Sequence, residues 1–125
     1  VVAVTGFTNE ALLQDEAPTY DEIGSDQLAL YLLDADMLDV LDTAEGVAVL
    51  GAPQVLRSAD GGVWLVFCNR SGELCRIEVE NHGFGSVEAL DEGADADAGT
   101  AHDVALTNNG GAVYTTGESV RVVAL

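Results

Sequence analysis

Residues 53–80 read PQVLRSADGGVWLVFCNRSGELCRIEVE, and this stretch decides the fold. Short runs of β-branched and aromatic residues alternate here with clusters of turn-forming residues, which is typical of consecutive antiparallel strands. The pattern predicts three strands, at Val55–Ser58, Val63–Cys68 and Leu74–Glu80.

Two turn signals determine how these strands pair. Asp60-Gly61 predicts a two-residue hairpin, because glycine adopts a positive φ without steric cost. Asn69 and Gly72 favour a type I turn with a bulge at the next connection.

These turns fix a register with two different faces. The first face is apolar throughout and is formed by the pairs Phe67–Cys75, Leu65–Ile77 and Val63–Val79. The second face is mixed, with Trp64, Val66 and Cys68 set against Leu74, Arg76 and Glu78. We therefore expect one core face and one half-solvated face, as in an antiparallel meander.

The composition indicates one globular unit. With 125 residues and 48% hydrophobic content, the chain can form a modest core and is not disordered in general. Residues 1–25 are interpreted as an N-terminal strand and arm, and residues 26–125 as a single β-repeat domain. The longest apolar run, Leu28–Leu33, is too short to span a bilayer, so membrane insertion is not expected.

Charge is the most unusual property of the sequence. The chain has 22 acidic and 4 basic residues, a formal net charge of −18, and all four basic residues are arginine. Such a surface repels itself at physiological ionic strength, where the Debye length is roughly 8 Å, and is screened at molar salt, where it is about 3 Å. The composition resembles that of proteins from salt-in halophiles, especially haloarchaea. The alternative is an ordinary acidic protein that binds a basic partner; nucleic acid and anionic membranes are poor partners for this field.

The N-terminal third gives weaker signals. Val1–Gly6 predicts a strand, and residues 7–25 predict an arm or long loop. Residues 26–42 are compatible with a helix that starts at Ser25, or with a hairpin of Leu28–Leu33 and Met37–Leu41 around Asp34-Ala35-Asp36. Four aspartates within the would-be helix, at positions 34, 36, 39 and 42, favour the hairpin, because aspartate is a poor helix former. Gly46–Leu50 then predicts another short strand.

The C-terminal part predicts more strands and a partial repeat. A turn at His82–Gly85 precedes a strand at Ser86–Leu90, and a second meander follows the acidic loop, with strands at Asp103–Asn108, Gly111–Thr116 and Ser119–Leu125. Its hairpin signals are Asn109-Gly110 and Gly117-Glu118. Residues 54–67 align with residues 103–116, turn on turn, and the repeat is interpreted as matching Trp64 with Tyr114.

These strand–turn–strand phrases resemble blades of β-propellers of the WD40/YVTN kind. The phrases are LALYLLDADMLDVLD, LRSADGGVWLVF and VALTNNGGAVYTTGESVRVVAL, and Ser58–Trp64 is also similar to a sialidase-type Asp-box that lacks one residue. The resemblance implies an all-β fold of two or three blades, too few to close a ring. Closure would then come from oligomerisation. A small β-sandwich or barrel is the alternative.

Candidate catalytic and metal-binding residues are few. His102-Asp103 could orient an imidazole for base chemistry, and His82 is the only other histidine. No phosphate-binding glycine motif and no G-x-S-x-G elbow occur, and no cofactor is expected. Asp91, Glu92, Asp95 and Asp97 are weak candidates for a metal site, because the EF-hand spacing is absent.

The cysteines and aromatic residues complete the candidate list. Cys68 and Cys75 lack C-x-x-C spacing and are expected to be two buried thiols, bridged only if the turn between them has two residues. Arg57 is expected to lie opposite Trp64 and to form a cation–π pair. Trp64, Arg57 and Tyr114 are the candidate ligand-binding residues, for a glycan.

Together these patterns favour a non-enzymatic structural protein. We expect a subunit of a larger haloarchaeal assembly, a virion component or a surface structure, rather than a cytoplasmic protein. Its partners would be copies of itself or other subunits. A glycan-binding lectin is the alternative, and an enzyme that uses His102 and Asp103 is a third hypothesis.

Overall fold

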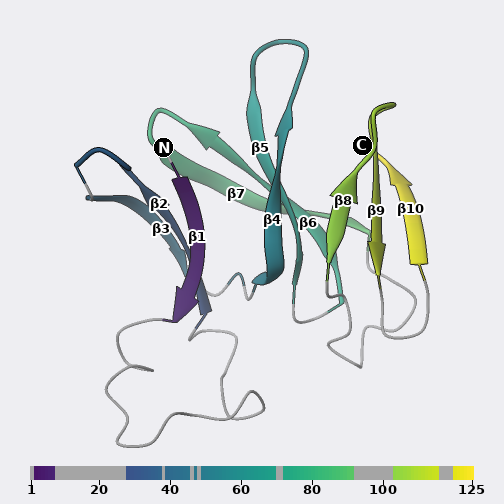
Figure 1. The fold of residues 1–125 in the computed structure, drawn as a ribbon, viewed down its shortest axis with the longest axis horizontal. Helices are drawn as coiled ribbons and strands as arrows, with labels where there is room; N and C mark the ends of the chain where they lie inside the picture. Colours follow the sequence, from purple (N-terminus) through teal and green to yellow (C-terminus); the bar gives the residue numbers. More distant parts are fainter. Residues whose placement is uncertain are drawn as a thin grey trace, which may run out of the picture.

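The computed structural model of the chain describes residues 2–7, 28–37, 39–45, 47, 49–69, 72–91, 103–115 and 120–125. This part of the chain contains β-strands and no helix (Figure 1). The strands are β1 (Val2–Phe7), β2 (Leu28–Leu33), β3 (Val40–Glu45), β4 (Val49–Arg57), β5 (Val63–Asn69), β6 (Leu74–Glu80), β7 (Gly83–Asp91), β8 (Val104–Leu106), β9 (Gly111–Thr115) and β10 (Val120–Ala124). The predicted all-β fold class is confirmed.

The described strands form three antiparallel sheets. The N-terminal sheet has the order β1-β2-β3, the central sheet β4-β5-β6-β7, and the C-terminal sheet β8-β9-β10. Each sheet is a meander in chain order, as the sequence predicts, and these strands do not close into a barrel. The first strands of the three sheets adjoin, since β4 contacts both β1 and β8 (Figure 1).

The predicted register of the central sheet is confirmed. Val63 pairs with Val79, Leu65 with Ile77 and Phe67 with Cys75, and the intervening pairs follow the same offset. The connection from β5 to β6 is the expected bulged turn, because the Gly72 N–H donates to the Asn69 carbonyl at 3.1 Å and Gly72 has φ +86°.

The central sheet is covered on both faces. One face packs against the N-terminal sheet through a cluster of Leu30, Val49, Leu65, Phe67, Cys75 and Ile77. The other packs against the C-terminal sheet through Val66, Cys68, Leu74, Val104, Ala112 and Tyr114. The expectation of a half-solvated second face was wrong for Val66, Cys68 and Leu74, which are fully buried. The end of this face with Trp64, Arg76 and Glu78 is partly exposed.

The Asp60-Gly61 turn is not a two-residue hairpin. The Ser58 N–H donates to the Gly62 carbonyl and the Gly61 N–H to the Ser58 carbonyl, so three residues lie in the loop and Gly61 occupies its left-handed position, φ +89°. The Asp60 carboxylate accepts hydrogen bonds from the Ser58 hydroxyl and, at 3.0 Å, from the Gly62 N–H, which hold the pKa of Asp60 below its ordinary value.

The Asn109-Gly110 turn has the same geometry. The Thr107 N–H donates to the Gly111 carbonyl at 2.9 Å, and Gly110 has φ +83°. The predicted repeat is therefore present at the level of the turns. Counted from the left-handed glycine, however, Tyr114 corresponds to Leu65 and Val113 to Trp64, so the match of Trp64 with Tyr114 was wrong by one residue.

The two-residue hairpin lies at Asn81-His82 instead. Glu80 pairs with Gly83, and both central residues have positive φ, 52° and 62°, as a type I′ turn requires. The strand expected at Ser86–Leu90 accordingly starts earlier, at Gly83, and ends at Asp91.

Residues 28–45 form a hairpin, as favoured from the sequence. The β2 strand has the expected bounds, whereas β3 begins at Val40 rather than at Met37. The turn is longer because the Asp34 carboxylate accepts hydrogen bonds from the backbone N–H groups of Asp36 and Met37, at 2.9 and 3.1 Å. These bonds lower the pKa of Asp34.

Two further expectations concern strand ends. The strand predicted at Val1–Gly6 is β1, at one edge of the N-terminal sheet. Gly46–Leu50 is not a separate strand, since β4 runs from Val49 to Arg57 with an irregularity between Leu50 and Gln54.

Residues 8–27, the turn at 117–118 and most of the acidic loop lie outside the described residues. No helix in the described ranges is long and apolar enough to cross a membrane.

Candidate functional site

The three candidate ligand-binding residues do not come together. Arg57 pairs with Val63, so it projects from the face of the central sheet opposite to Trp64. The cation over the Trp64 ring is Arg76, whose guanidinium carbon lies 4.3 Å from the ring centroid. The expected Arg57–Trp64 pair was therefore wrong. Arg76 also pairs with Glu88, with 2.9 Å between Nε and Oε2.

Tyr114 is fully buried between the central and C-terminal sheets. Its hydroxyl donates to Asp91 Oδ2 at 2.6 Å, and the Arg121 guanidinium donates to both carboxylate oxygens of Asp91, at 2.9 and 3.2 Å. Burial, followed by the bond to the Asp91 carboxylate, raises the pKa of Tyr114 to about 12. This arrangement holds the end of β7 against β9 and β10 and leaves Tyr114 inaccessible to a glycan.

The candidate metal ligands are not assembled in the described part of the chain. Asp91 is engaged by Tyr114 and Arg121, while Asp95 and Asp97 lie outside the described residues, as does Glu92. The described residues contain no group of three or more His, Cys, Asp or Glu side chains that could hold a metal ion.

Of the candidate catalytic pair His102-Asp103, only Asp103 lies in the described part of the chain. Asp103 accepts a hydrogen bond from the Val104 N–H at 2.9 Å, which is a local backbone contact at the start of β8. His102 lies outside the described residues, and His82 is on the exposed β6–β7 turn.

The two cysteines are free and buried, as expected. Cys68 belongs to the cluster beneath the C-terminal sheet and Cys75 to the cluster beneath the N-terminal sheet, so the sheet separates them. Burial raises the pKa of Cys68 to about 11 and that of Cys75 to about 12, which makes both thiols poor nucleophiles.

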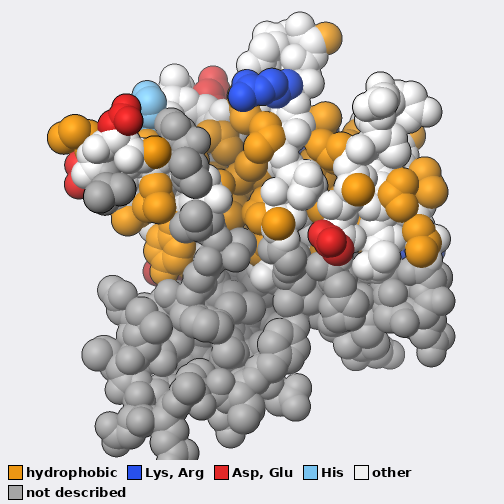
Figure 2. All heavy atoms as spheres, in the orientation of Figure 1, with side chains coloured by type: hydrophobic (Ala, Val, Ile, Leu, Met, Phe, Trp, Pro, Cys, Tyr) orange, Lys and Arg blue, Asp and Glu red, His pale blue; other side chains and the backbone are white. Residues whose placement is uncertain are grey.

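The outer face of the C-terminal sheet is the feature that the sequence interpretation missed. Its register places Ala105, Val113 and Val122 in one row across the three strands. Val120 and Val122 are 65% and 74% exposed, and Ala105 and Ala124 are also exposed. Figure 2 shows hydrophobic side chains over β10 at this side of the molecule. We call Ala105, Val113, Thr115, Val120, Val122 and Ala124 the open face.

The strand residues of the open face are uncharged in a strongly charged chain, and the exposed Asp103 lies at its end, opposite Thr115. Residues 104–115 and 120–125 contain no aspartate or glutamate, and their single charged residue, Arg121, points to the other side of the sheet and holds Asp91. A contiguous exposed apolar surface marks an interaction site, and a lack of charged residues is typical of interface cores. The sequence signal for it was this acid-free segment, together with the alternation in residues 120–124.

Comparison with known proteins does not indicate a function for this chain. The chain matches no family model, no curated protein and no solved structure.

Proposed function

We propose that the chain is a non-enzymatic structural subunit that joins a larger assembly through the open face of its C-terminal sheet. The observation that carries the proposal is the exposure of Val120 and Val122 on a sheet face whose strand residues are uncharged, in a chain of net charge −18. Exposed apolar surface of this kind is stabilised by burial, at about 25 cal/mol per Å².

The internal repeat supports a further sheet as the occupant. With the Ser58–Gly62 and Thr107–Gly111 turns superposed, Val113 and Thr115 correspond to Trp64 and Val66. In the central sheet, the Val66 face is covered by the C-terminal sheet. The equivalent face of the C-terminal sheet is therefore suited to receive a following sheet.

We propose that a second copy supplies this sheet. The three described sheets have adjoining first strands and stack face against face, which supports the propeller resemblance. Two copies stacked head to tail would supply six sheets, within the four to eight of closed propellers.

The charge supports work in concentrated salt. None of the carboxylates in the described ranges is buried, so they repel one another through solvent. Screening in brine would let such subunits associate, as in a haloarchaeal virion or surface structure.

Light scattering in about 2–3 M KCl, where exposed charges are screened, tests the proposal. We expect a defined oligomer for the wild type and monomers for Val122→Asp, which places a charge in the middle row of the open face. Val87→Asp is the matched control, because Val87 is an exposed valine on β7 in the central sheet, 43% exposed. A monomeric wild type, or equal effects of the two variants, would contradict the proposal.

A further inference from the structure

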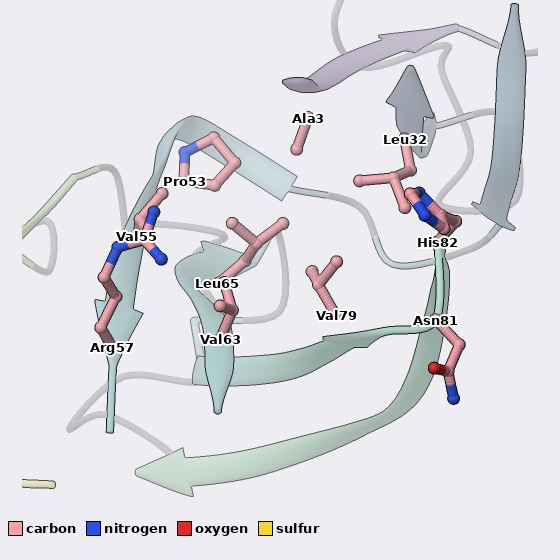
Figure 3. Close-up of a pocket in the computed structure, with 10 residues that line it drawn as sticks. All are labelled: Ala3, Leu32, Pro53, Val55, Arg57, Val63, Leu65, Val79, Asn81 and His82. Atoms are coloured by element: carbon pink, nitrogen blue, oxygen red, sulfur yellow. The ribbon is translucent and has the colours of Figure 1, made fainter. Parts of the chain in front are cut away.

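A cavity of about 740 Å³ lies between the N-terminal and central sheets. Figure 3 shows Pro53, Val55 and Arg57 on one side, Leu32, Asn81 and His82 on the other, and Val63, Leu65 and Val79 between them. This volume is within the range of small-molecule sites, which are roughly 300–1,000 Å³.

The walls of the cavity are apolar for a structural reason. Val55, Val63, Leu65 and Val79 are on one face of the central sheet, because their strands pair Val55 with Leu65 and Val63 with Val79. The N-terminal sheet contacts the same face beside the cavity through Leu30. Val55 lies where the cavity opens to solvent and is 53% exposed, whereas its cross-strand partner Leu65 is buried.

Arg57 gives the cavity a cationic side. Of the arginines in the described ranges, Arg76 pairs with Glu88 and Arg121 with Asp91, whereas no described carboxylate lies within ion-pair distance of Arg57. The described lining of the cavity also contains no aspartate or glutamate.

We propose that this cavity binds a small carboxylate with an unbranched apolar tail, of the fatty-acid type. The carboxylate would accept hydrogen bonds from the Arg57 guanidinium, whose planar fork suits a bidentate contact. The tail would lie along Val63, Leu65 and Val79, where it displaces water from apolar surface. A sugar fits less well, because the described lining offers only the polar side chains of Arg57, Asn81 and His82.

Calorimetric titration of the full chain with octanoate, decanoate and dodecanoate, in about 2 M KCl, tests the apolar part of the proposal. Each added methylene should tighten the Kd about fourfold while the tail fits the cavity. Decylammonium is the control ligand, and it should bind more weakly than decanoate because its charge is opposite. A Kd independent of tail length, or tighter binding of decylammonium, would overturn the proposal.

Three variants test the location. Arg57→Gln should weaken decanoate binding about three- to tenfold. Arg76→Gln removes the same charge from the opposite face of the same sheet and should leave the Kd unchanged. Val55→Trp should abolish binding, because an indole at this half-exposed position fills the cavity without replacing a core residue.

Two outcomes would overturn the assignment. Equal effects of Arg57→Gln and Arg76→Gln would show that the carboxylate does not bind at this cavity. Absence of decanoate binding would also overturn it, and a changed oligomer mass for Val55→Trp would then assign the cavity to a protein segment. The open face is on the other side of the molecule, and Val122→Asp should leave the decanoate Kd unchanged.

Discussion

Cys68 and Cys75 are buried on opposite faces of the central sheet, because Cys68 pairs with Leu74 and Cys75 with Phe67. The bulged turn at Gly72 creates this offset. A two-residue turn would have set the two cysteines opposite each other.

Both thiols should therefore be inert in the folded protein. Their pKa values, raised by burial to about 11 and about 12, leave almost no thiolate at neutral pH. We expect a maleimide to label neither cysteine in the native state and to label both after unfolding in guanidinium. Rapid native labelling, or an intramolecular disulfide detected by mass spectrometry, would disagree with the register.

Removal of the Tyr114 hydroxyl should weaken the contact between β7 and the C-terminal sheet. Tyr114→Phe deletes a buried bond to Asp91 while Arg121 still holds the carboxylate, so the free energy of unfolding should fall by about 1 kcal/mol. Denaturant titration measures this change. Glu88→Gln, which disrupts the more exposed pair with Arg76, is the control and should cost less.

Alkaline pH should destabilise the protein through the same tyrosine. The folded-state pKa of about 12 exceeds the value of about 10 for an unfolded tyrosine, so the folded state keeps this proton to higher pH. The stabilisation is complete below about pH 10 and is lost as the pH rises through 12. Phenolate absorbance should show a late-titrating component, and Tyr114→Phe should remove it. An unchanged titration curve in that variant would contradict the burial of Tyr114.

The matched turns should respond alike to alanine. Gly61→Ala and Gly110→Ala force a side chain into φ values of +89° and +83°, but the added Cβ would meet no atom within 4 Å. Each substitution should therefore lower the free energy of unfolding through backbone strain alone, by about 1 kcal/mol. Denaturant titration measures this change. Gly61→Asn should cost less, because asparagine tolerates left-handed backbone. If alanine were neutral at both sites, the assigned turn geometry would be incorrect.

Low salt should loosen the protein. Dialysis to about 0.1 M NaCl lengthens the Debye length to about 10 Å and restores repulsion among the exposed carboxylates. We expect a lower Tm and a smaller oligomer than in molar salt. A Tm indifferent to salt would argue against adaptation to brine.

Local patterns predicted the strands and their register well. The alternation in residues 63–68 and 74–80 fixed which side chains share a face of the central sheet, and the structure agrees. What covers each face could not be predicted this way. Val66 and Cys68 are buried by Val104, Ala112 and Tyr114, which follow some forty residues later in the chain.

Turn types were harder to predict than turn positions. Asp60-Gly61 is typical of a two-residue hairpin, but the hydrogen bonds from Ser58 and Gly62 to the Asp60 carboxylate favour the longer loop. The true two-residue turn includes His82, a residue that gives no such signal.

The cation–π pair was assigned to the wrong arginine, because the face on which each arginine lies depends on the register. Arg57 shares its face with Val63, whereas Arg76 is on the Trp64 face.

The central claim is that the open face is buried in the assembly, and a single introduced thiol tests it most directly. Because both native cysteines should be inert, Val122→Cys provides the reactive site, at a position that is 74% exposed in the isolated chain. We expect slow maleimide labelling of Val122→Cys in the oligomer and fast labelling in dilute, dissociated protein, whereas Val87→Cys should react fast in both. Equally fast labelling of the two variants in the oligomer would contradict the account.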